Sequence, residues 1–171
     1  QGAINIGRGL ELIIETMEFL NNCALVVIGN GDIYKDLLKK VEHKKLNHKI
    51  HFLGKISPDE LHKLTPLAHL GLSIEEDLGL NYRFALPNKI FDYIQAEVPI
   101  LVSNLPEMKM ISINYNVGEI VKNRKPIELA KQIEELIEKD FSINLNKAKK
   151  ELIWENQEEK LISIFNKSIN V

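Results

Sequence analysis

The sequence lacks an excess of charge of either sign, and it has a single cysteine. Lys and Arg number 22 against 24 Asp and Glu, so the formal net charge is −2. This balance provides no positive field to attract a phosphate backbone, which argues against nucleic acid as a partner. Cys23 by itself can form neither a disulfide framework nor a cysteine-rich zinc site, and it fits a reducing compartment.

Long apolar runs are also missing. The longest have about five residues, as in 24–28, whereas a membrane-spanning helix needs about 20. No signal-peptide pattern opens the sequence, and 171 residues suit one domain that buries roughly 70% of its unfolded surface. We therefore expect a soluble, cytoplasmic globular domain over residues 1–171.

Metal-ligand spacings are absent as well. The acidic turn Glu75-Glu76-Asp77 could bind a cation, but we expect a solvated turn. None of the five histidines has the spacing of zinc ligands, so the sequence predicts no metal site. The histidines are His43, His48, His51, His62 and His69.

Two periodicities alternate along the first 121 residues. The apolar runs 24–28 and 98–102 do not alternate with polar residues, which indicates strands covered on both faces. Each run is followed by a turn and a helix long enough for a parallel crossover. The pattern predicts an α/β fold, a Rossmann-like doubly wound parallel sheet with helices on both faces. The predicted helices are 8–21, 32–46, 58–65, 88–96 and 106–113, and the predicted strands are 24–28, 50–53, 69–74, 98–102 and 118–121.

The two ends of the chain differ from this alternation. Helical spacing after Pro126, and then over 142–152 and 154–168, predicts that the chain closes with helices. Gln1-Gly2 leads into a loop and a helix, although a doubly wound domain should open with a strand. We therefore expect a fragment that lacks its first strand and a partner half. A complete domain that simply begins with a helix is the alternative.

Ligands of open parallel sheets bind beyond the carboxyl ends of the strands, so the loops there are the candidate sites. The loop 2–9 has Gly2, Gly7 and Gly9, which allow close backbone approach, and Arg8 lies at the start of a helix. A helix start and a forked guanidinium both suit a phosphate. No Gly-Lys-Ser/Thr follows, so the loop is not a P-loop, and a solvated surface loop is the alternative.

Two further loops follow the strands 24–28 and 50–53. The first lacks the third glycine of a dinucleotide fingerprint, and the second has a glycine where a flat ring could approach the backbone. Ordinary turns are the alternative for both. The loops are Gly29-Asn30-Gly31 and Leu53-Gly54-Lys55.

The long irregular stretch 73–87 is the most informative candidate. Pro87-Asn88 predicts a cap for helix 88–96, with the free amides of residues 88–91 pointing into a cleft. Lys89 opposes the helix dipole in the first turn, and a bound anion would compensate. Asp92, about one turn further on, could accept hydrogen bonds from sugar hydroxyls. The alternative makes both side chains solvated surface residues.

The ordered set of the Gly-Asn-Gly loop, "HFLG", "LPNKIFDY", "VPILVSNLPEM" and "IWENQEEKL" resembles the carboxyl-terminal, donor-binding half of the family 4 (group 1) glycosyltransferases. The resemblance covers nearly all of the chain and implies one half of a GT-B fold. It implies that a nucleotide-diphospho-sugar donor (a UDP-, GDP- or ADP-sugar) binds in a cleft against an amino-terminal acceptor domain. The sugar is then transferred with retention to a glycan or lipid-linked acceptor, without cofactor or obligatory metal.

The family's first loop carries two cations that reach the diphosphate, and only one of them matches here. Ala3 stands at the first position and Arg8 at the second, so Arg83 or Lys89 would supply the missing charge. By this resemblance Arg8 and Lys89 are the catalytic candidates, because they would stabilise charge that develops on the leaving diphosphate.

The family's paired acidic motif is altered too. Asp92 matches the second acid, which binds the ribose hydroxyls, whereas Phe84 stands where the first acid would contact the transferred sugar. One of the three acids in 75–77 could replace it. The donor-binding set implied by the resemblance is Gly2, Gly7, Gly29, Asn30, Gly31, Leu53, Gly54, Lys55, Arg83, Pro87, Asn88, Lys89 and Asp92. The 171-residue chain alone should bind donor weakly and transfer nothing.

Two other functions remain open at this point. A GT-B nucleotide-sugar 2-epimerase shares the fold but changes the sugar without an acceptor. A doubly wound interaction domain like a response-regulator receiver needs an acidic pair and an exposed aspartate at strand ends, where this chain has glycines and Asn30. The lysine pairs 39–40, 44–45 and 149–150 predict exposed helix faces, with slight peripheral attraction to an anionic membrane as the alternative.

Overall fold

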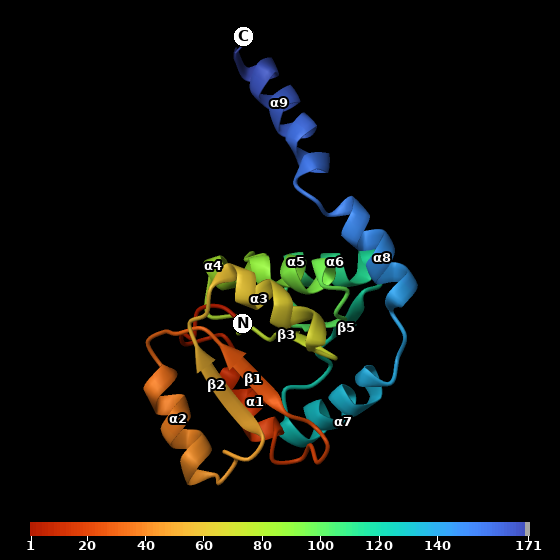
Figure 1. Cartoon of the computed structure of the whole chain (residues 1–171). Helices are drawn as coiled ribbons and strands as arrows, with labels where there is room; N and C mark the ends of the chain where they lie inside the picture. Colours follow the sequence, from red (N-terminus) through yellow and green to blue (C-terminus); the bar gives the residue numbers. More distant parts are fainter. Residues whose placement is uncertain (170–171) are drawn as a thin grey trace.

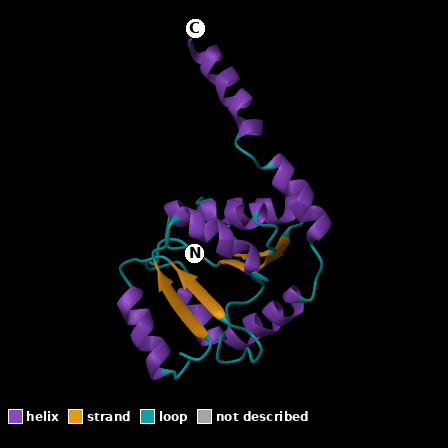
Figure 2. Ribbon diagram, in the orientation of Figure 1, coloured by secondary structure: helices purple, strands orange, loops and turns teal. Residues whose placement is uncertain are grey.

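The computed structural model describes residues 1–169, in which helices and short strands alternate (Figures 1 and 2). The strands are β1 (Leu25–Ile28), β2 (Ile50–Gly54), β3 (Gly71–Ser73), β4 (Ile100–Val102) and β5 (Gly118–Ile120). The helices are α1 (Leu10–Thr16), α2 (Tyr34–His43), α3 (Pro58–Leu64), η1 (Thr65–Leu67), α4 (Leu80–Arg83), α5 (Asn88–Gln95), α6 (Pro106–Tyr115), α7 (Pro126–Ile137), α8 (Ser142–Glu151) and α9 (Glu155–Ile169). This order confirms the predicted α/β class.

All strand pairs are parallel, as predicted, but they form two sheets instead of one. β1 pairs with β2, and β3, β4 and β5 form the second sheet in that order. Gly2 and Ile4 donate hydrogen bonds to the carbonyls of Ile28 and Asn30, at 2.9 and 3.0 Å. Residues 2–4 therefore reach β1 just at its carboxyl end, and no described strand bridges β1 to β3.

β4 is the most completely buried of the described strands. Ile100, Leu101 and Val102 are fully buried, as the unbroken apolar run predicted. β1 differs from the prediction, because Val26 is 49% exposed. Helix α2 covers the opposite face of the β1–β2 sheet, where Tyr34 packs edge-on against Phe52 of β2. A two-stranded sheet covered on one face leaves the other side chains in solvent.

Several helix ends differ from the sequence-based limits. α1 ends at Thr16. The chain continues in turns, in which the amide of Glu18 donates to the carbonyl of Glu15 and that of Phe19 to the carbonyl of Thr16. Met17 and Leu20 are nevertheless buried, so the helical spacing extended beyond the helix itself. α4 lies within the stretch 73–87, which we expected to be irregular. It was not predicted because four residues are too few to produce a periodic pattern.

The last helix, α9, projects away from the body of the molecule (Figure 1). Its large apolar side chains are more than half exposed; they are Leu161, Ile162, Ile164 and Phe165. Within residues 1–169, no helix combines the length and the apolar character needed to cross a lipid bilayer.

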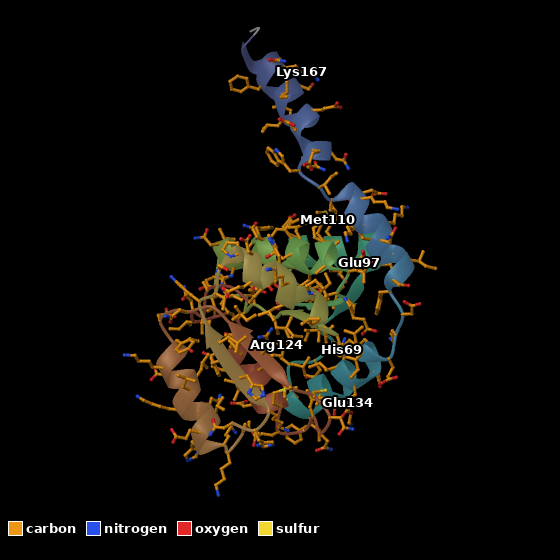
Figure 3. All side chains as sticks on the ribbon, viewed as in Figure 1. His69, Glu97, Met110, Arg124, Glu134 and Lys167 are labelled. Carbon is orange, nitrogen blue, oxygen red and sulfur yellow. The ribbon has the colours of Figure 1, made fainter. Side chains whose placement is uncertain are left out.

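One lysine of each predicted pair contacts an acid on another part of the chain. Lys40 pairs with Glu15, Lys44 with Glu18, and Lys149 with Glu97, which is labelled in Figure 3. These pairs join α2 to α1 and its following turn, and α8 to the turn after α5. Membrane attraction stays a prediction.

Candidate functional site

The loops at the carboxyl ends of β1 and β3 pack directly against the amino-terminal loop 2–9. A Cβ atom on Gly29 would lie 1.8 Å from the carbonyl oxygen of Gly2, and one on Gly31 would lie 2.2 Å from that of Ile4. The amide of Glu76 donates to the carbonyl of Gly7 at 2.8 Å. Gly29 and Gly31 are needed because backbone meets backbone at both positions, and their contacts with a donor stay a prediction.

A buried carboxylate lies where these loops meet. The side chain of Glu75, just after β3, is 0% exposed, and its Oε1 lies 2.8 Å from Nζ of Lys89 on α5. A guanidinium nitrogen of Arg8 lies 3.7 Å from the same oxygen. The hydroxyl of Ser73 donates to Oε2 at 2.8 Å. The structure therefore brings together the two cations that the sequence analysis singled out, and it places them on one acid. We call these four residues the Glu75 cluster.

The backbone of Glu75 is held as firmly as its side chain. Its carbonyl oxygen accepts from the Ser103 hydroxyl at 2.6 Å and from the Arg124 guanidinium at 3.2 Å. Arg124, labelled in Figure 3, also lies 3.8 Å from the carboxylate of Glu76. Neither Ser103 nor Arg124 was among the residues predicted from the sequence. Both follow strand ends, so inspection of every such loop would have found them.

Lys89 differs from its expected surroundings. An anion was expected to compensate for a cation in the first turn of α5, but the carboxylate of Glu75 already does so. The predicted cap at Pro87-Asn88 and the predicted start of the helix at residue 88 are confirmed, because Pro87 is the N-cap and Asn88 is the first helical residue. Ile90 donates its amide to the carbonyl of Pro87 at 3.1 Å, so the free amides are fewer than residues 88–91.

Arg83 does not join the Glu75 cluster. Its guanidinium makes a two-pronged contact with Asp77, with nitrogen–oxygen distances of 2.8 and 3.0 Å, and both side chains are partly exposed. This hydrogen bonding raises the pKa of Arg83. Of the two residues offered as the missing cation, Lys89 therefore lies beside Arg8, and Arg83 is neutralised by an acid of its own.

Asp92 lies on α5 and faces the amino-terminal residue. Its Oδ2 accepts a hydrogen bond from Nε2 of Gln1 at 2.9 Å, and the other side of that amide accepts from Thr65. The next residue, Tyr93, is buried, and its pKa is raised by burial and by the nearby charges of Glu75 and Asp92. The carboxylate of Asp92 thus already accepts from an amide, and its charge and that of Glu75 both act on the buried Tyr93.

The two remaining candidate loops lie side by side. The amide of Gly29 donates to the carbonyl of Gly54 at 2.8 Å, which joins the ends of β1 and β2. Asn30 accepts from the amide of Gly31 through its own side chain, a local turn contact. Leu53 is 47% exposed and Lys55 is also exposed. The structure therefore places both predicted loops at one edge of the β1–β2 sheet.

The loop that carries Arg8 and the segment around α4 both have exposed apolar side chains. They are Ile6, Leu78, Leu80 and Phe84. The hydroxyl of Tyr82 donates to the carbonyl of Ile6 at 3.1 Å, and the Arg8 guanidinium lies 5.8 Å from the centre of the Tyr82 ring. Phe84, which the resemblance aligns with the family's first acid, is one of these exposed apolar residues.

No group of three His, Cys, Asp or Glu side chains within the described part of the chain is arranged to hold a metal ion.

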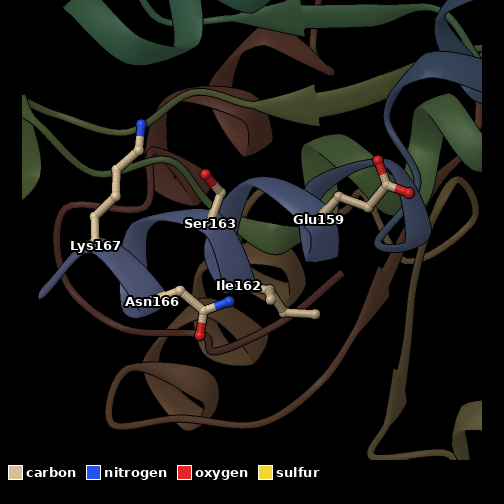
Figure 4. Close-up of a pocket in the computed structure, with 5 residues that line it drawn as sticks. All are labelled: Glu159, Ile162, Ser163, Asn166 and Lys167. Carbon is tan, nitrogen blue, oxygen red and sulfur yellow. The ribbon is translucent and has the colours of Figure 1, made fainter. Parts of the chain in front are cut away.

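A surface hollow lies outside this site. Figure 4 shows a hollow whose lining belongs wholly to the projecting helix α9. Its residues are Glu159, Ile162, Ser163, Asn166 and Lys167. This hollow is a helix face and takes no part in the Glu75 cluster.

The two cations of the Glu75 cluster, Arg8 and Lys89, lie at the carboxyl edge of a parallel sheet. This arrangement is chemically suited to an anion such as a phosphate. Residues 2–158 match the model of the family described as glycosyl transferases group 1. The chain belongs to this family. No curated protein sequence gives a significant match.

Solved structures of glycosyltransferases share the fold. Anabaena HepE in complex with UDP has 14% sequence identity and a TM-score of 0.79, over 97% of this chain and 48% of HepE. AviGT4, which is involved in avilamycin A biosynthesis, has 13% identity and a TM-score of 0.76, over 99% of this chain and 50% of AviGT4. The carboxyl-terminal domain of LpcC, a group 1 family protein of Francisella tularensis, has 18% identity and a TM-score of 0.64, over 85% of this chain and 76% of that domain.

These comparisons confirm the expected family and the GT-B-type fold. The chain spans about half the length of HepE and AviGT4. They support a glycosyltransferase domain, and the individual site residues stay predictions.

Proposed function

We propose that this chain binds the nucleotide-diphospho-sugar donor of a retaining glycosyltransferase. The observation that carries the proposal is the pairing of Arg8 and Lys89 around one buried acid, which leaves one positive charge in excess. That excess lies at the carboxyl edge of the sheets, beside the start of α5, where a diphosphate would be attracted by both the charge and the helix dipole.

A UDP-sugar is the donor we propose first, with GDP- and ADP-sugars as the alternatives. The support is that the HepE structure, which shares the fold over nearly the whole chain, contains UDP. The loops after β1 and β2 would border the phosphates and the base. Asp92 would orient the ribose hydroxyls by exchanging its contact with Gln1 for one with the donor.

In the proposed reaction the nucleoside diphosphate leaves as the bond to the sugar breaks. Negative charge then grows on the phosphate oxygens, and Arg8 and Lys89 would stabilise it more strongly than in the ground state. An amino-terminal acceptor domain would supply the glycan or lipid-linked acceptor. The chain alone should therefore bind donor and transfer nothing, and the complete enzyme would act in the cytoplasm.

Calorimetric titration of the 171-residue chain with UDP, GDP and ADP tests the donor site. One nucleotide should bind, and Lys89→Gln should weaken its binding about tenfold or more, because a hydrogen bond to a charged group is lost. Lys131→Gln is the matched control, since Lys131 lies on α7 and its side chain is 61% exposed. Equal affinities of wild type and Lys89→Gln would contradict the proposed site.

A further inference from the structure

We propose that Glu75 is a positioning residue, which fixes the side chains of Arg8 and Lys89 so that they meet the donor's diphosphate already aligned. This inference rests on the proposed function. Glu75 would act through the two cations and never touch the donor, because its side chain is 0% exposed. It therefore does not replace the sugar-contacting acid of the family, a role that the sequence left open for residues 75–77.

The two carboxylate oxygens of Glu75 have different surroundings. Oε2 accepts the hydroxyl hydrogen of Ser73 at 2.8 Å. Oε1 is buried and makes no hydrogen bond of good geometry with a described residue, yet Lys89 lies 2.8 Å and Arg8 3.7 Å away. A buried carboxylate is costly unless cations compensate it. Oε1 is thus placed to attract both cations while saturating neither.

The position of this carboxylate is imposed by the body of the molecule. Ser103 and Arg124 hold the carbonyl of Glu75, and Ser73 of β3 holds Oε2. Arg8 comes from the loop before α1 and Lys89 from the first turn of α5, so the acid joins two elements that are far apart in sequence. Glu75 is the common point to which both long side chains are tied.

Fixing these side chains before binding should strengthen the binding of the diphosphate. Lys and Arg side chains lose considerable rotamer entropy when a ligand orders them, and a partner that orders them beforehand removes this cost. The two cations retain accessible surface, 32% for the Arg8 side chain and 16% for that of Lys89. They can therefore contact a phosphate on one side while Glu75 holds them on the other.

The opposite effect on affinity is also physically reasonable, which makes the inference testable. Removing the negative charge of Glu75 raises the local positive potential, and potential alone would tighten the binding of an anion. Positioning predicts the reverse, because the freed cations would lose their alignment. The sign of the change in affinity decides between the two effects.

The test compares UDP with uridine as ligands of the 171-residue chain and its Glu75→Gln variant. UDP affinity should fall about tenfold, as expected when two long side chains must be ordered on binding. Uridine affinity should stay within about twofold, because uridine has no phosphate for the cations to meet. Glu128→Gln is the matched control, since Glu128 lies on α7, outside the Glu75 cluster, and its side chain is 45% exposed.

Side-chain NMR provides a readout that a purely structural role would not change. In the wild type the Nε–Hε group of Arg8 should give an ordered signal, and in Glu75→Gln that signal should show increased mobility while the backbone spectrum is preserved. If Glu75→Gln fails to fold, Ser73→Ala keeps the charge and removes one hydrogen bond. It should weaken UDP binding by a smaller factor, about threefold, because Glu75 keeps its charge and both cations and loses only one of the hydrogen bonds that hold it.

The outcomes separate the two proposals. Wild-type chain that binds none of UDP, GDP and ADP would overturn both the donor site and the role of Glu75. UDP binding that is unchanged or tighter in Glu75→Gln would overturn the positioning role and leave the donor site standing. Equal losses for UDP and uridine would also overturn positioning, because they would indicate general damage to the site.

Discussion

Among single residues, Glu119 is a carboxylate whose pKa is set by several neighbouring side chains together. It lies on β5, and its side chain is 16% exposed. Burial on its own would raise the pKa of this carboxyl, but contacts from Lys139, Gln132 and Lys122 outweigh burial and lower the pKa to about 2. Since its ordinary value is 4.5, the folded state holds the ionised form more strongly than the unfolded chain does.

Glu119→Gln should therefore destabilise the chain in a pH-dependent way. The ionised Glu119 stabilises the folded state. This contribution to the free energy of unfolding is fully present above pH 4.5 and is lost as the pH falls toward about 2. At pH 7 we expect a loss of about 1–2 kcal/mol in the free energy of unfolding, because the exposed lysine partners are screened by water. Urea denaturation of wild type and Glu119→Gln at pH 7 and pH 3.5 should show a smaller loss of stability in the variant at the lower pH. A loss that is the same at both pH values would refute this assignment.

Among the secondary-structure elements, the main feature is the close packing of the loops at the carboxyl ends of the strands. Gly9 precedes α1 with φ +74°, and a Cβ there would lie 2.0 Å from the carbonyl oxygen of Ile74, at the end of β3. The neighbouring segment supplies Glu75 to the cluster. The approach of the loop 2–9 to β3 is therefore what brings Arg8 and Glu75 together.

Gly9→Ala should separate these two elements. The substitution combines a left-handed backbone conformation with a clash against backbone, so we expect a loss of about 2–4 kcal/mol in the free energy of unfolding. Gly54→Ala is the matched control, because Gly54 has φ +69° but open space around its Cβ position. It should cost about 1 kcal/mol, from the conformation alone. Equal losses in the two variants would show that the contact with Ile74 is not tight.

The order of elements could be predicted from sequence at this scale, because it depends on local patterns. The apolar run of β4 indicated a fully buried strand, and Pro126 marked the start of α7. The exposed face of β1 could not be predicted, since it depends on which helices cover the sheet. α4 is too short to leave a periodic signal.

At the scale of the whole molecule, the site is assembled from segments that are distant in sequence. The candidates Arg8 and Lys89 could be chosen from the sequence because each lies near a helix start. That both contact Glu75 could not be foreseen, because the contact requires the fold to place β3 between the first loop and α5. The same holds for Arg124, which reaches Glu75 from the loop after β5.

The division into two parallel sheets also appears only at this scale. A one-dimensional pattern gives the number of strands but not which of them are hydrogen-bonded. Here β1 and β3 remain unpaired with each other, and the loop 2–9 joins their carboxyl ends through Gly2, Ile4 and Gly7. We therefore expect the donor to bind where the two sheets are linked, at the surface formed by these loops and the start of α5.

Mapping UDP by two-dimensional amide NMR on the 171-residue chain tests this claim most directly. We expect resonances to shift progressively with UDP concentration in residues 2–9, 29–31, 75–77 and 88–92, while those of α7 and α9 stay in place. Shifts concentrated on α9, or no shift with UDP, GDP or ADP at millimolar concentration, would contradict a donor site built around Arg8 and Lys89.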